Sequence, residues 1–366
     1  MKNSATMSSD SSSTVTIFQC NAPLEVIHAH LVRAQHADEP GDWFLAYPEW
    51  VSPLGVRADM WREAISVQDS RPEYGAIASR IRTNLARLQS RIPFERYSRI
   101  DLVVSDLFWL MNNVLAGEVA RLCEQRGIDF GLSILDEGSV LYTGSRLGVR
   151  RTLRCWAKFA YLKLHGFAGF WLHPKNVDYL HPLCKRVFCL HPKLLSPPSR
   201  ILIEEIDPRL LERVYGERLV SVSLPPKSCL YLFQPLYKLV GVQRQLQIVH
   251  GFLGYLRQRG IRHFYYKPHH ADLPHWCGLL EGECGLKPLE LREMVPIEFL
   301  SARCNADVIL SHSTSALLNL HAYGFRGEVI AYGLDKLRQS FPEASQFEDY
   351  TRALKALGGI ELVAAE

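Results

Sequence analysis

Three short polar clusters, each placed directly after an apolar strand-like segment, carry the residue types of an acid–base and phosphate-handling site. The first is Asp136-Glu137-Gly138, the second runs from Lys267 to His270, and the third runs from Ser311 to Ser315. A carboxylate serves as a general base, Lys and His supply positive charge and a proton, and a Ser/Thr turn offers hydroxyls and backbone N–H groups. This combination predicts chemistry in which a phosphate group leaves and the protein neutralises its charge.

Each cluster also has an ordinary structural explanation when it is taken alone. A Ser-Thr-Ser run before a helix is usually an N-cap, and an Asp-Glu-Gly turn after a strand is usually a solvated turn. Their shared placement favours function, because ligands of open α/β sheets bind beyond the carboxyl ends of the strands. We therefore expect the three clusters to form one site.

The segments around these clusters alternate between strand and helix patterns. Apolar, strand-like runs cover residues 14–20, 43–47, 100–105, 130–135, 228–233, 261–266, 306–310 and 329–332. Helical spacing covers residues 24–34, 107–126 and 243–259, with a further helix after the Ser311–Ser315 turn. Alternating strands and helices predict an α/β fold with parallel sheets that are covered on both faces.

A Pro-rich and then charged stretch at 190–218 predicts the junction between two domains. We place an N-terminal Rossmann-like domain at 14–200 and a C-terminal Rossmann-like domain at 201–366, and we allow the last helix to pack back on the first domain. The Ser-rich residues 1–13 lack the apolar run of a secretory signal and predict a disordered leader, which indicates a cytoplasmic address.

Composition excludes several classes of protein. The 366 residues are 47% hydrophobic and 22% charged, which argues against disorder, and the net charge of +4 is too small to indicate a nucleic-acid partner. No run approaches the length of a membrane span, and no Gly-x-Gly-x-x-Gly follows the first strand, so a dinucleotide site is not expected. Neither Asp-x-Asp nor a zinc-type cysteine spacing occurs, so we expect no metal and no cofactor.

The clusters also carry a resemblance to a known family. Asp136-Glu137-Gly138, Lys267-Pro268-His269 and Ser313-Thr314 follow the order of the D/E-D/E-G, HP and S-S/T motifs of bacterial sialyltransferases of the GT-B type, the group that includes capsule polysialyltransferases and lipooligosaccharide sialyltransferases. The segments 21–24 and 296–300 are similar to two further stretches of that group. In this chain His270 replaces the proline of the HP motif, which leaves open whether His269 or His270 faces the ligand.

The resemblance implies a GT-B fold, with two Rossmann-like domains facing each other across a cleft, and a specific reaction. An acidic nine-carbon sugar would pass from its CMP-activated form to a hydroxyl of a glycan or glycolipid acceptor, with inversion and without a metal. Glu137 would be the general base, supported by Asp136, and His269 would assist the departing phosphate. The donor-binding residues would be Lys267, Glu298, Ser313, Thr314 and Ser315. The acceptor would lie on the N-terminal side and the nucleotide on the C-terminal side.

A basic stripe lies on a further predicted helix. Arg146, Arg150, Arg154 and Lys158 recur every four residues, with Val149, Leu153, Trp156, Ala157 and Ala160 around the other side. Such a stripe is either a solvated helix face or a contact for anionic lipid or an acidic glycan. Under the transferase hypothesis it would hold the enzyme at the inner face of the membrane or bind an anionic acceptor chain.

Three alternatives remain open from the sequence. The donor is Kdo or another CMP-activated acid sugar, the chain is a sugar-nucleotide epimerase or hydrolase on the same fold, or it is a non-catalytic glycan-binding protein. The residues do not choose among the acid sugars, the linkages or the acceptors.

Overall fold

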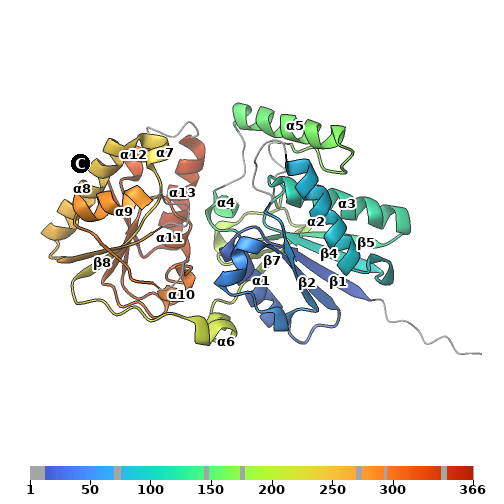
Figure 1. Cartoon of the computed structure of the whole chain (residues 1–366), viewed down its shortest axis with the longest axis horizontal. Helices are drawn as coiled ribbons and strands as arrows, with labels where there is room; N and C mark the ends of the chain where they lie inside the picture. The colour runs from blue at the N-terminus through green and yellow to red at the C-terminus, as the bar shows by residue number, and fades with distance from the viewer. Residues whose placement is uncertain are drawn as a thin grey trace, which may run out of the picture. The chain divides into compact units, whose positions relative to one another are not determined.

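The computed structural model describes residues 13–69, 76–143, 148–173, 178–268, 274–291, 295–338 and 344–365. Contacts divide the chain into two compact units, each built on one parallel sheet. Figure 1 shows both sheets with their covering helices. The predicted α/β architecture of two Rossmann-like parallel sheets is confirmed. Residues 1–12 of the expected leader lie outside the described residues.

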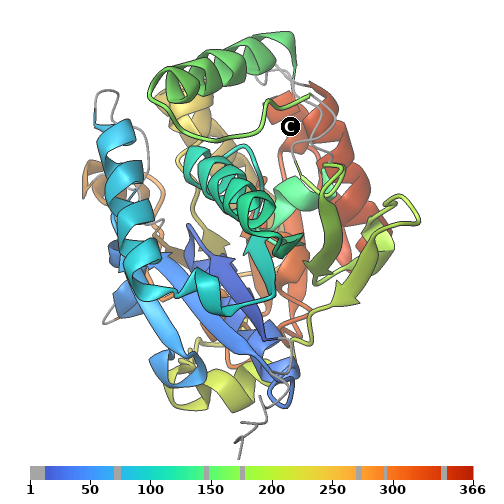
Figure 2. The same cartoon turned by 90° about the vertical axis from the view of Figure 1, so that its right-hand side faces the viewer.

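The first sheet has seven strands in the order β3-β2-β1-β4-β5-β6-β7, and every described pairing is parallel. The elements of this unit are β1 (Thr14–Gln19), α1 (Pro23–Gln35), β2 (Asp42–Pro48), β3 (Glu63–Val67), α2 (Ile77–Arg91), β4 (Arg99–Val104), α3 (Leu110–Arg126), β5 (Asp129–Leu135), α5 (Val149–Leu164), β6 (Cys184–Cys189) and β7 (Leu202–Glu205). Helices α2 and α3 pack side by side (Figure 2). Gly127 ends α3 in the left-handed conformation, with φ 68°.

The second sheet has six strands in the order β10-β9-β8-β11-β12-β13, again with parallel pairing throughout its described strands. Its unit contains α4 (Ser139–Tyr142), α6 (Leu210–Tyr215), β8 (Ser228–Leu232), α7 (Tyr237–Val240), α8 (Val242–Gln258), β9 (His263–Lys267), α9 (Pro274–Gly282), β10 (Lys287–Pro288), α10 (Glu298–Ser301), β11 (Val308–Ser311), α11 (Ala316–Asn319), β12 (Glu328–Tyr332), α12 (Leu334–Arg338), α13 (Ala344–Leu357) and β13 (Ile360–Val363). Strands β8 and β11 are buried at every position, as expected for central parallel strands.

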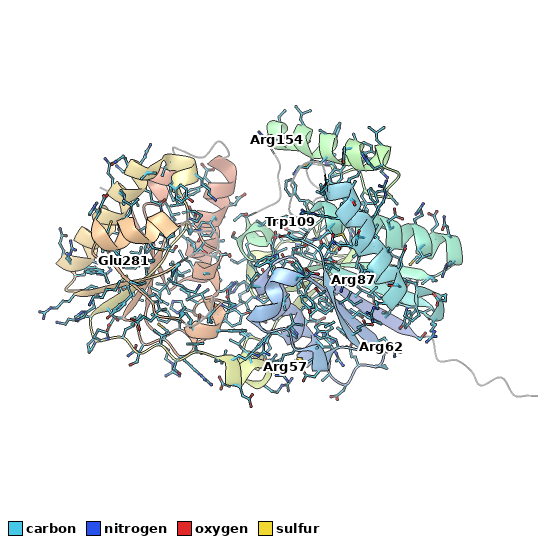
Figure 3. The ribbon with its side chains drawn as sticks, in the orientation of Figure 1. Arg57, Arg62, Arg87, Trp109, Arg154 and Glu281 are labelled. Atoms are coloured by element: carbon cyan, nitrogen blue, oxygen red, sulfur yellow. The ribbon has the colours of Figure 1, made fainter. Side chains whose placement is uncertain are left out.

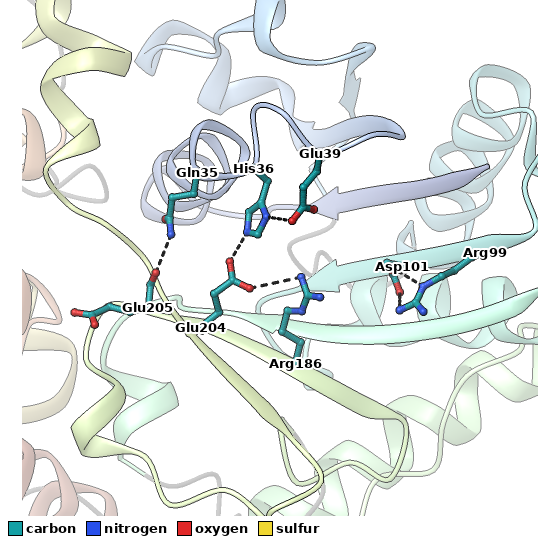
Figure 4. A network of polar contacts seen from close by, with 8 residues as sticks. All are labelled: Gln35, His36, Glu39, Arg99, Asp101, Arg186, Glu204 and Glu205. Atoms are coloured by element: carbon teal, nitrogen blue, oxygen red, sulfur yellow. Dashed lines mark hydrogen bonds and ion pairs between the residues drawn. The ribbon is translucent and has the colours of Figure 1, made fainter. Parts of the chain in front are cut away.

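The division between the units differs from the predicted boundary after residue 200. Strand β7 pairs with β6 of the first sheet, so the first unit extends to Ile206. Side chains hold β7 there: His36 bonds to Glu204, and the Gln35 side chain donates to the Glu205 carbonyl at 2.9 Å (Figure 4).

Two segments of the predicted N-terminal domain group with the second unit instead of the first, namely residues 137–143 and 190–196. Helix α13, which we allowed to pack back on the first domain, contacts α11, α12 and β13 of its own unit. It also contacts α4 and the short 3-10 helix Pro192–Leu194, both of which belong to those two segments.

Candidate functional site

The acidic turn begins directly after β5 and divides its two carboxylates between different environments. Asp136 is fully buried, its N–H donates to the Phe188 carbonyl at 2.9 Å, and its own carbonyl accepts from Nδ1 of His28 at 2.7 Å. Glu137 is half-buried. Gly138 has φ 109°, a conformation that favours glycine, so the motif's third residue is required by the turn.

Helix α4, which follows Glu137, is tied to the second unit. The Tyr142 hydroxyl accepts hydrogen bonds from the N–H groups of Leu190 and His191, at 3.1 and 3.0 Å. The His191 side chain in turn bonds to the side-chain oxygen of Asn319 on α11, at 3.2 Å. Because α4 also contacts α13, the segment that carries Glu137 is anchored to the helices behind the Ser/Thr turn.

The Ser/Thr turn after β11 is fixed by a residue that the motifs did not include, Gln234. The Gln234 side-chain oxygen accepts from the Ser313 N–H at 2.9 Å, and the Gln234 carbonyl accepts from the Gln245 side chain at 2.7 Å. The Ser311 hydroxyl donates to the Leu232 carbonyl at 2.7 Å. Strands β8 and β11 are neighbours where the order of the second sheet changes direction, which is the position where open α/β sheets bind ligands.

A second support for this turn comes from α13. The Tyr350 hydroxyl donates to the Thr314 carbonyl at 2.8 Å, and the Thr314 hydroxyl accepts from the Ala316 N–H at 3.3 Å. Ser313, Thr314 and Ser315 are each half-buried. The helix that follows, α11, has only four residues, so its dipole contributes little at the turn, which offers mainly hydroxyls and local N–H groups.

Lys267 and Glu298 interact electrostatically. Glu298 is 6% exposed, and burial raises the pKa of its carboxyl, while the positive charge of Lys267 acts in the opposite direction. Lys267 is the last residue of β9, next to β8 in the sheet, and Glu298 begins α10. The structure therefore brings together two of the predicted donor-binding residues.

His312, which lies between Ser311 and Ser313, has a structural role. Its ring is fully buried, its Nδ1 donates to the Tyr332 carbonyl at 2.8 Å, and its Nε2 accepts from the Tyr231 hydroxyl at 2.9 Å. Burial lowers the pKa of His312 to about 4, so the ring is neutral at pH 7. It fixes the start of the turn to the two neighbouring strands.

The predicted site residues that the structure describes divide between the two units as follows. The second unit contains Glu137, Lys267, Glu298, Ser313, Thr314 and Ser315, whereas Asp136 belongs to the first unit. His269, His270 and Arg146 lie outside the described residues. Gln234 was missed because a single glutamine after a strand has no sequence signature, and only the pairing of β8 with β11 brings it to Ser313.

Helix α5 has two apolar faces, and only one of them is buried. Cys155, Phe159 and Leu162 face the protein. A second set of large apolar side chains is exposed: Val149 (79%), Leu153 (61%), Trp156 (49%) and Leu164 (87%). Because each residue of an α-helix is rotated by about 100° about the helix axis relative to the previous one, these four exposed side chains lie on the same face of α5. The large apolar side chains that we placed on the other side of the helix from the basic stripe are therefore largely exposed.

The basic residues of α5 lie beside this exposed apolar face. Arg154 is exposed and labelled on α5 in Figure 3, whereas Lys158 is half-buried with its Nζ 5.4 Å from the centre of the Phe108 ring. Arg150 lies on the same helix, and its side chain is outside the described part of the structure.

Within the described ranges there is no group of three or more His, Cys, Asp or Glu side chains arranged to hold a metal ion. Likewise, no helix in the described part of the chain has the length and apolarity needed to cross a membrane.

Comparison with known proteins identifies the fold. No protein-family model matches the chain, and no curated protein matches it. Among solved structures it is similar to the UDP-GlcNAc 2-epimerase from Methanocaldococcus jannaschii, with 12% identity, a TM-score of 0.52, and coverage of 96% of this chain and 89% of that one.

Two further solved structures are similar over most of their length. The UDP-GlcNAc 2-epimerase from Neisseria meningitidis bound to UDP-GlcNAc has 13% identity and a TM-score of 0.51, with 97% of this chain and 88% of that one covered. The glycotransferase of kitacinnamycin has 15% identity and a TM-score of 0.47, with 95% and 96% covered. The likeness to the two epimerases, together with the two parallel sheets, shows that this chain has the GT-B fold.

Proposed function

We propose that the protein is an inverting glycosyltransferase that moves sialic acid, or a related nonulosonic acid, from a CMP-activated donor to a hydroxyl of a glycan acceptor. The three motifs in order and the GT-B fold support this function. The observation that carries it is the Ser313–Ser315 turn, which Gln234 and Tyr350 hold where the strand order of the second sheet reverses. Capsule and lipooligosaccharide synthesis are the processes that the motif resemblance favours.

In this proposal the second unit binds the nucleotide. The hydroxyls of Ser313, Thr314 and Ser315 and the ammonium of Lys267 receive the phosphate. Glu298, whose carboxyl is buried beside Lys267, accepts hydrogen bonds from the ribose hydroxyls. His269 donates a proton or a hydrogen bond to the departing phosphate. These groups meet the charge of a monophosphate ester, so no divalent cation is required.

Glu137 is the proposed general base. Its carboxylate takes the proton of the acceptor hydroxyl as that oxygen forms a bond to the anomeric carbon, and the bond from this carbon to the phosphate oxygen breaks. CMP leaves with the electron pair. Asp136 is enclosed and hydrogen-bonded through its backbone to His28 and Phe188, which suits a residue that positions the turn.

Helix α5 supports a proposal about where the enzyme works. Exposed Val149, Leu153, Trp156 and Leu164 beside basic side chains match a helix that lies in a lipid interface, where apolar groups enter the acyl boundary and Lys and Arg meet anionic headgroups. We place this face against an anionic inner-membrane surface. Binding of an acidic glycan is the alternative for the basic residues alone.

A second candidate function is suggested by the two similar epimerase structures, which would make the chain a UDP-sugar epimerase. The experiment that separates the two is a donor panel in the presence of EDTA. CMP-sialic acid, CMP-Kdo and UDP-GlcNAc are each incubated with and without methyl β-D-galactopyranoside as acceptor. The transferase proposal expects CMP and a new glycoside in equal amounts. Turnover of CMP-Kdo alone would reassign the donor, and conversion of UDP-GlcNAc to its C2 epimer without acceptor would overturn the transferase proposal.

A further inference from the structure

The strand order of the first sheet also changes direction, between β1 and β4. The chain leaves β1 towards β2 through α1, and it leaves β4 towards β5 through α3. Such a reversal separates the two connecting segments at the carboxyl edge of the sheet and leaves room for a ligand. The nucleotide site proposed above uses only the equivalent position in the second sheet. The first sheet therefore has a switch point with no function assigned to it.

A narrow pocket lies at this position. Its polar lining consists of Gln19, Asn21, Gln68 and Asp69, and its apolar lining consists of Pro48, Val67 and Trp109. Trp109, labelled in Figure 3, directly precedes α3. The free space of about 10 Å³ admits one group of the size of a water molecule or a hydroxyl.

The side chain of Gln19 supplies the pocket with a hydrogen-bond acceptor. Gln19 is 1% exposed, and its Oε1 has no hydrogen-bond donor among the described residues. Its Nε2 donates to the Cys20 carbonyl at 3.2 Å, which settles which end of the amide is the oxygen. A buried carbonyl oxygen without a donor is costly. A ligand that brings a hydrogen-bond donor into the pocket removes this cost.

The surrounding residues are held in place before any ligand binds. The Asn21 side chain donates to Asn112 at 3.0 Å, and Asn112 donates to the Asp106 carbonyl at 2.9 Å. On the opposite side, the buried Asn84 makes two hydrogen bonds to the backbone of Gln68, at 2.9 and 3.0 Å. The pocket is therefore preorganised, which reduces the entropy lost on binding.

Charge restricts the ligand to one that is not an anion. The carboxyl group of Asp69 lines the pocket, and the carboxyl group of Asp106 accepts from the N–H of the lining residue Trp109 at 2.8 Å. Glu25, which accepts from the Asn21 N–H at 2.6 Å, adds little negative charge. Burial, together with the charge of Asp106, raises the pKa of Glu25 to about 8, so this carboxyl is mostly protonated at pH 7. The hydrogen-bond acceptors of the pocket can accept from a ligand hydroxyl, and the indole ring of Trp109 can pack against apolar C–H groups of the ligand. A hydroxyl on a ring with apolar C–H faces combines both features.

We propose that this pocket binds one hydroxyl of a neutral sugar, which donates to Oε1 of Gln19 while the sugar ring lies against Trp109. The identification of this sugar as the glycosyl acceptor rests on the proposed function. The binding of the sugar does not, because it follows from the lining of the pocket alone.

Saturation-transfer NMR with methyl β-D-galactopyranoside and methyl β-D-glucopyranoside tests the proposal without any donor present. Wild type is compared with Gln19→Leu and Trp109→Leu. The matched control is Gln35→Leu, the same substitution in the same unit but at a glutamine that bonds to the Glu205 carbonyl, away from the pocket. The melting temperature of each variant is measured alongside.

We expect wild type and Gln35→Leu to bind at least one glycoside, and Gln19→Leu and Trp109→Leu to bind it about tenfold more weakly. The melting temperature of Gln19→Leu should equal or exceed that of wild type, because the substitution removes an unsatisfied buried oxygen. Equal affinity in all four proteins, or no binding to wild type because the pocket holds a resident water only, overturns the proposal. Sugar binding without any transfer would refute the proposed function and leave this inference standing.

Discussion

The side-chain oxygen of Gln234 accepts a hydrogen bond from the backbone N–H of Ser313 at 2.9 Å, across 79 residues of sequence. This contact joins the segment after β8 to the turn after β11, and the Gln245 side chain donates to the Gln234 carbonyl. The conformation of the proposed phosphate-binding turn therefore depends on a side chain that does not itself belong to the turn.

Gln234→Leu is predicted to weaken donor binding while the turnover number changes little. The substitution leaves the Ser313 N–H without its acceptor, so the turn no longer rests in the conformation that receives the phosphate, and the KM for the CMP-sugar rises about tenfold. Steady-state kinetics at varied donor concentration measure the KM for the CMP-sugar and the turnover number separately. Gln243→Leu on the exposed side of α8 is the control, and an unchanged donor KM in Gln234→Leu would count against the assignment.

Glu137→Gln is predicted to lower transfer by about 10²- to 10⁴-fold, the range typical of a removed general base. CMP affinity should stay at the wild-type value, because the amide has the same size and the nucleotide contacts come from other residues. Rates of CMP release and calorimetric titration with CMP report the two quantities. Glu217→Gln, at an exposed position of the same unit, is the matched control. A variant that keeps its rate is incompatible with Glu137 as the base.

The pH dependence of stability should contain a signature of Glu25. Its folded-state pKa of about 8 lies above the value near 4.3 of an unfolded Glu, so the folded protein retains this proton over that interval. Its contribution to the free energy of unfolding therefore falls as pH rises between these two values. Glu25→Gln removes this dependence of the free energy of unfolding on pH.

Melting temperatures from pH 5 to pH 8 test this prediction. The difference between Glu25→Gln and wild type should become more positive as pH rises, whereas Glu124→Gln, at an exposed position on α3, should follow wild type throughout. Parallel curves for Glu25→Gln and wild type would show that Glu25 ionises normally in the folded protein.

Much of the fold was predictable because its central strands are continuous apolar runs. Strands β1, β4, β5, β8, β11 and β12 lie within one or two residues of the predicted segments, as do α1 and α8. The edge strands were missed. β7 has the sequence LIEE, lies half-exposed at the edge of its sheet and falls in a stretch that resembles a linker, so it contains no continuous apolar run.

The site was predictable only where residues adjoin in sequence. The acidic turn and the Ser/Thr turn are each a run of adjacent residues, and in the structure they lie at the carboxyl ends of β5 and β11, as the apolar runs before them predict. Gln19 and Gln234 are single residues whose partners come from other strands. Their significance depends on strand order, which local patterns do not specify.

The exposed apolar face of α5 is predicted to bind anionic lipid. Leu153→Ser with Leu164→Ser should reduce sedimentation with phosphatidylglycerol vesicles, and charge reversal at Arg150 and Arg154 should do the same, because both apolar insertion and headgroup attraction contribute. Transfer to a short neutral acceptor should persist. The exposed Leu202→Ser on β7 serves as the control for loss of a surface leucine. Unchanged vesicle binding in both variants would exclude α5 as the membrane contact.

The proposed role of the turn from Ser313 to Ser315 in binding the phosphate of a cytidine nucleotide is tested by calorimetric titration with CMP and with cytidine. We expect wild type to bind CMP at least about tenfold more tightly than cytidine, since charge-assisted hydrogen bonds to the phosphate are lost in the nucleoside. In the variant Ser313→Ala with Thr314→Val this difference should largely disappear. Equal affinity of wild type for CMP and cytidine, or an undiminished difference in the variant, would contradict it.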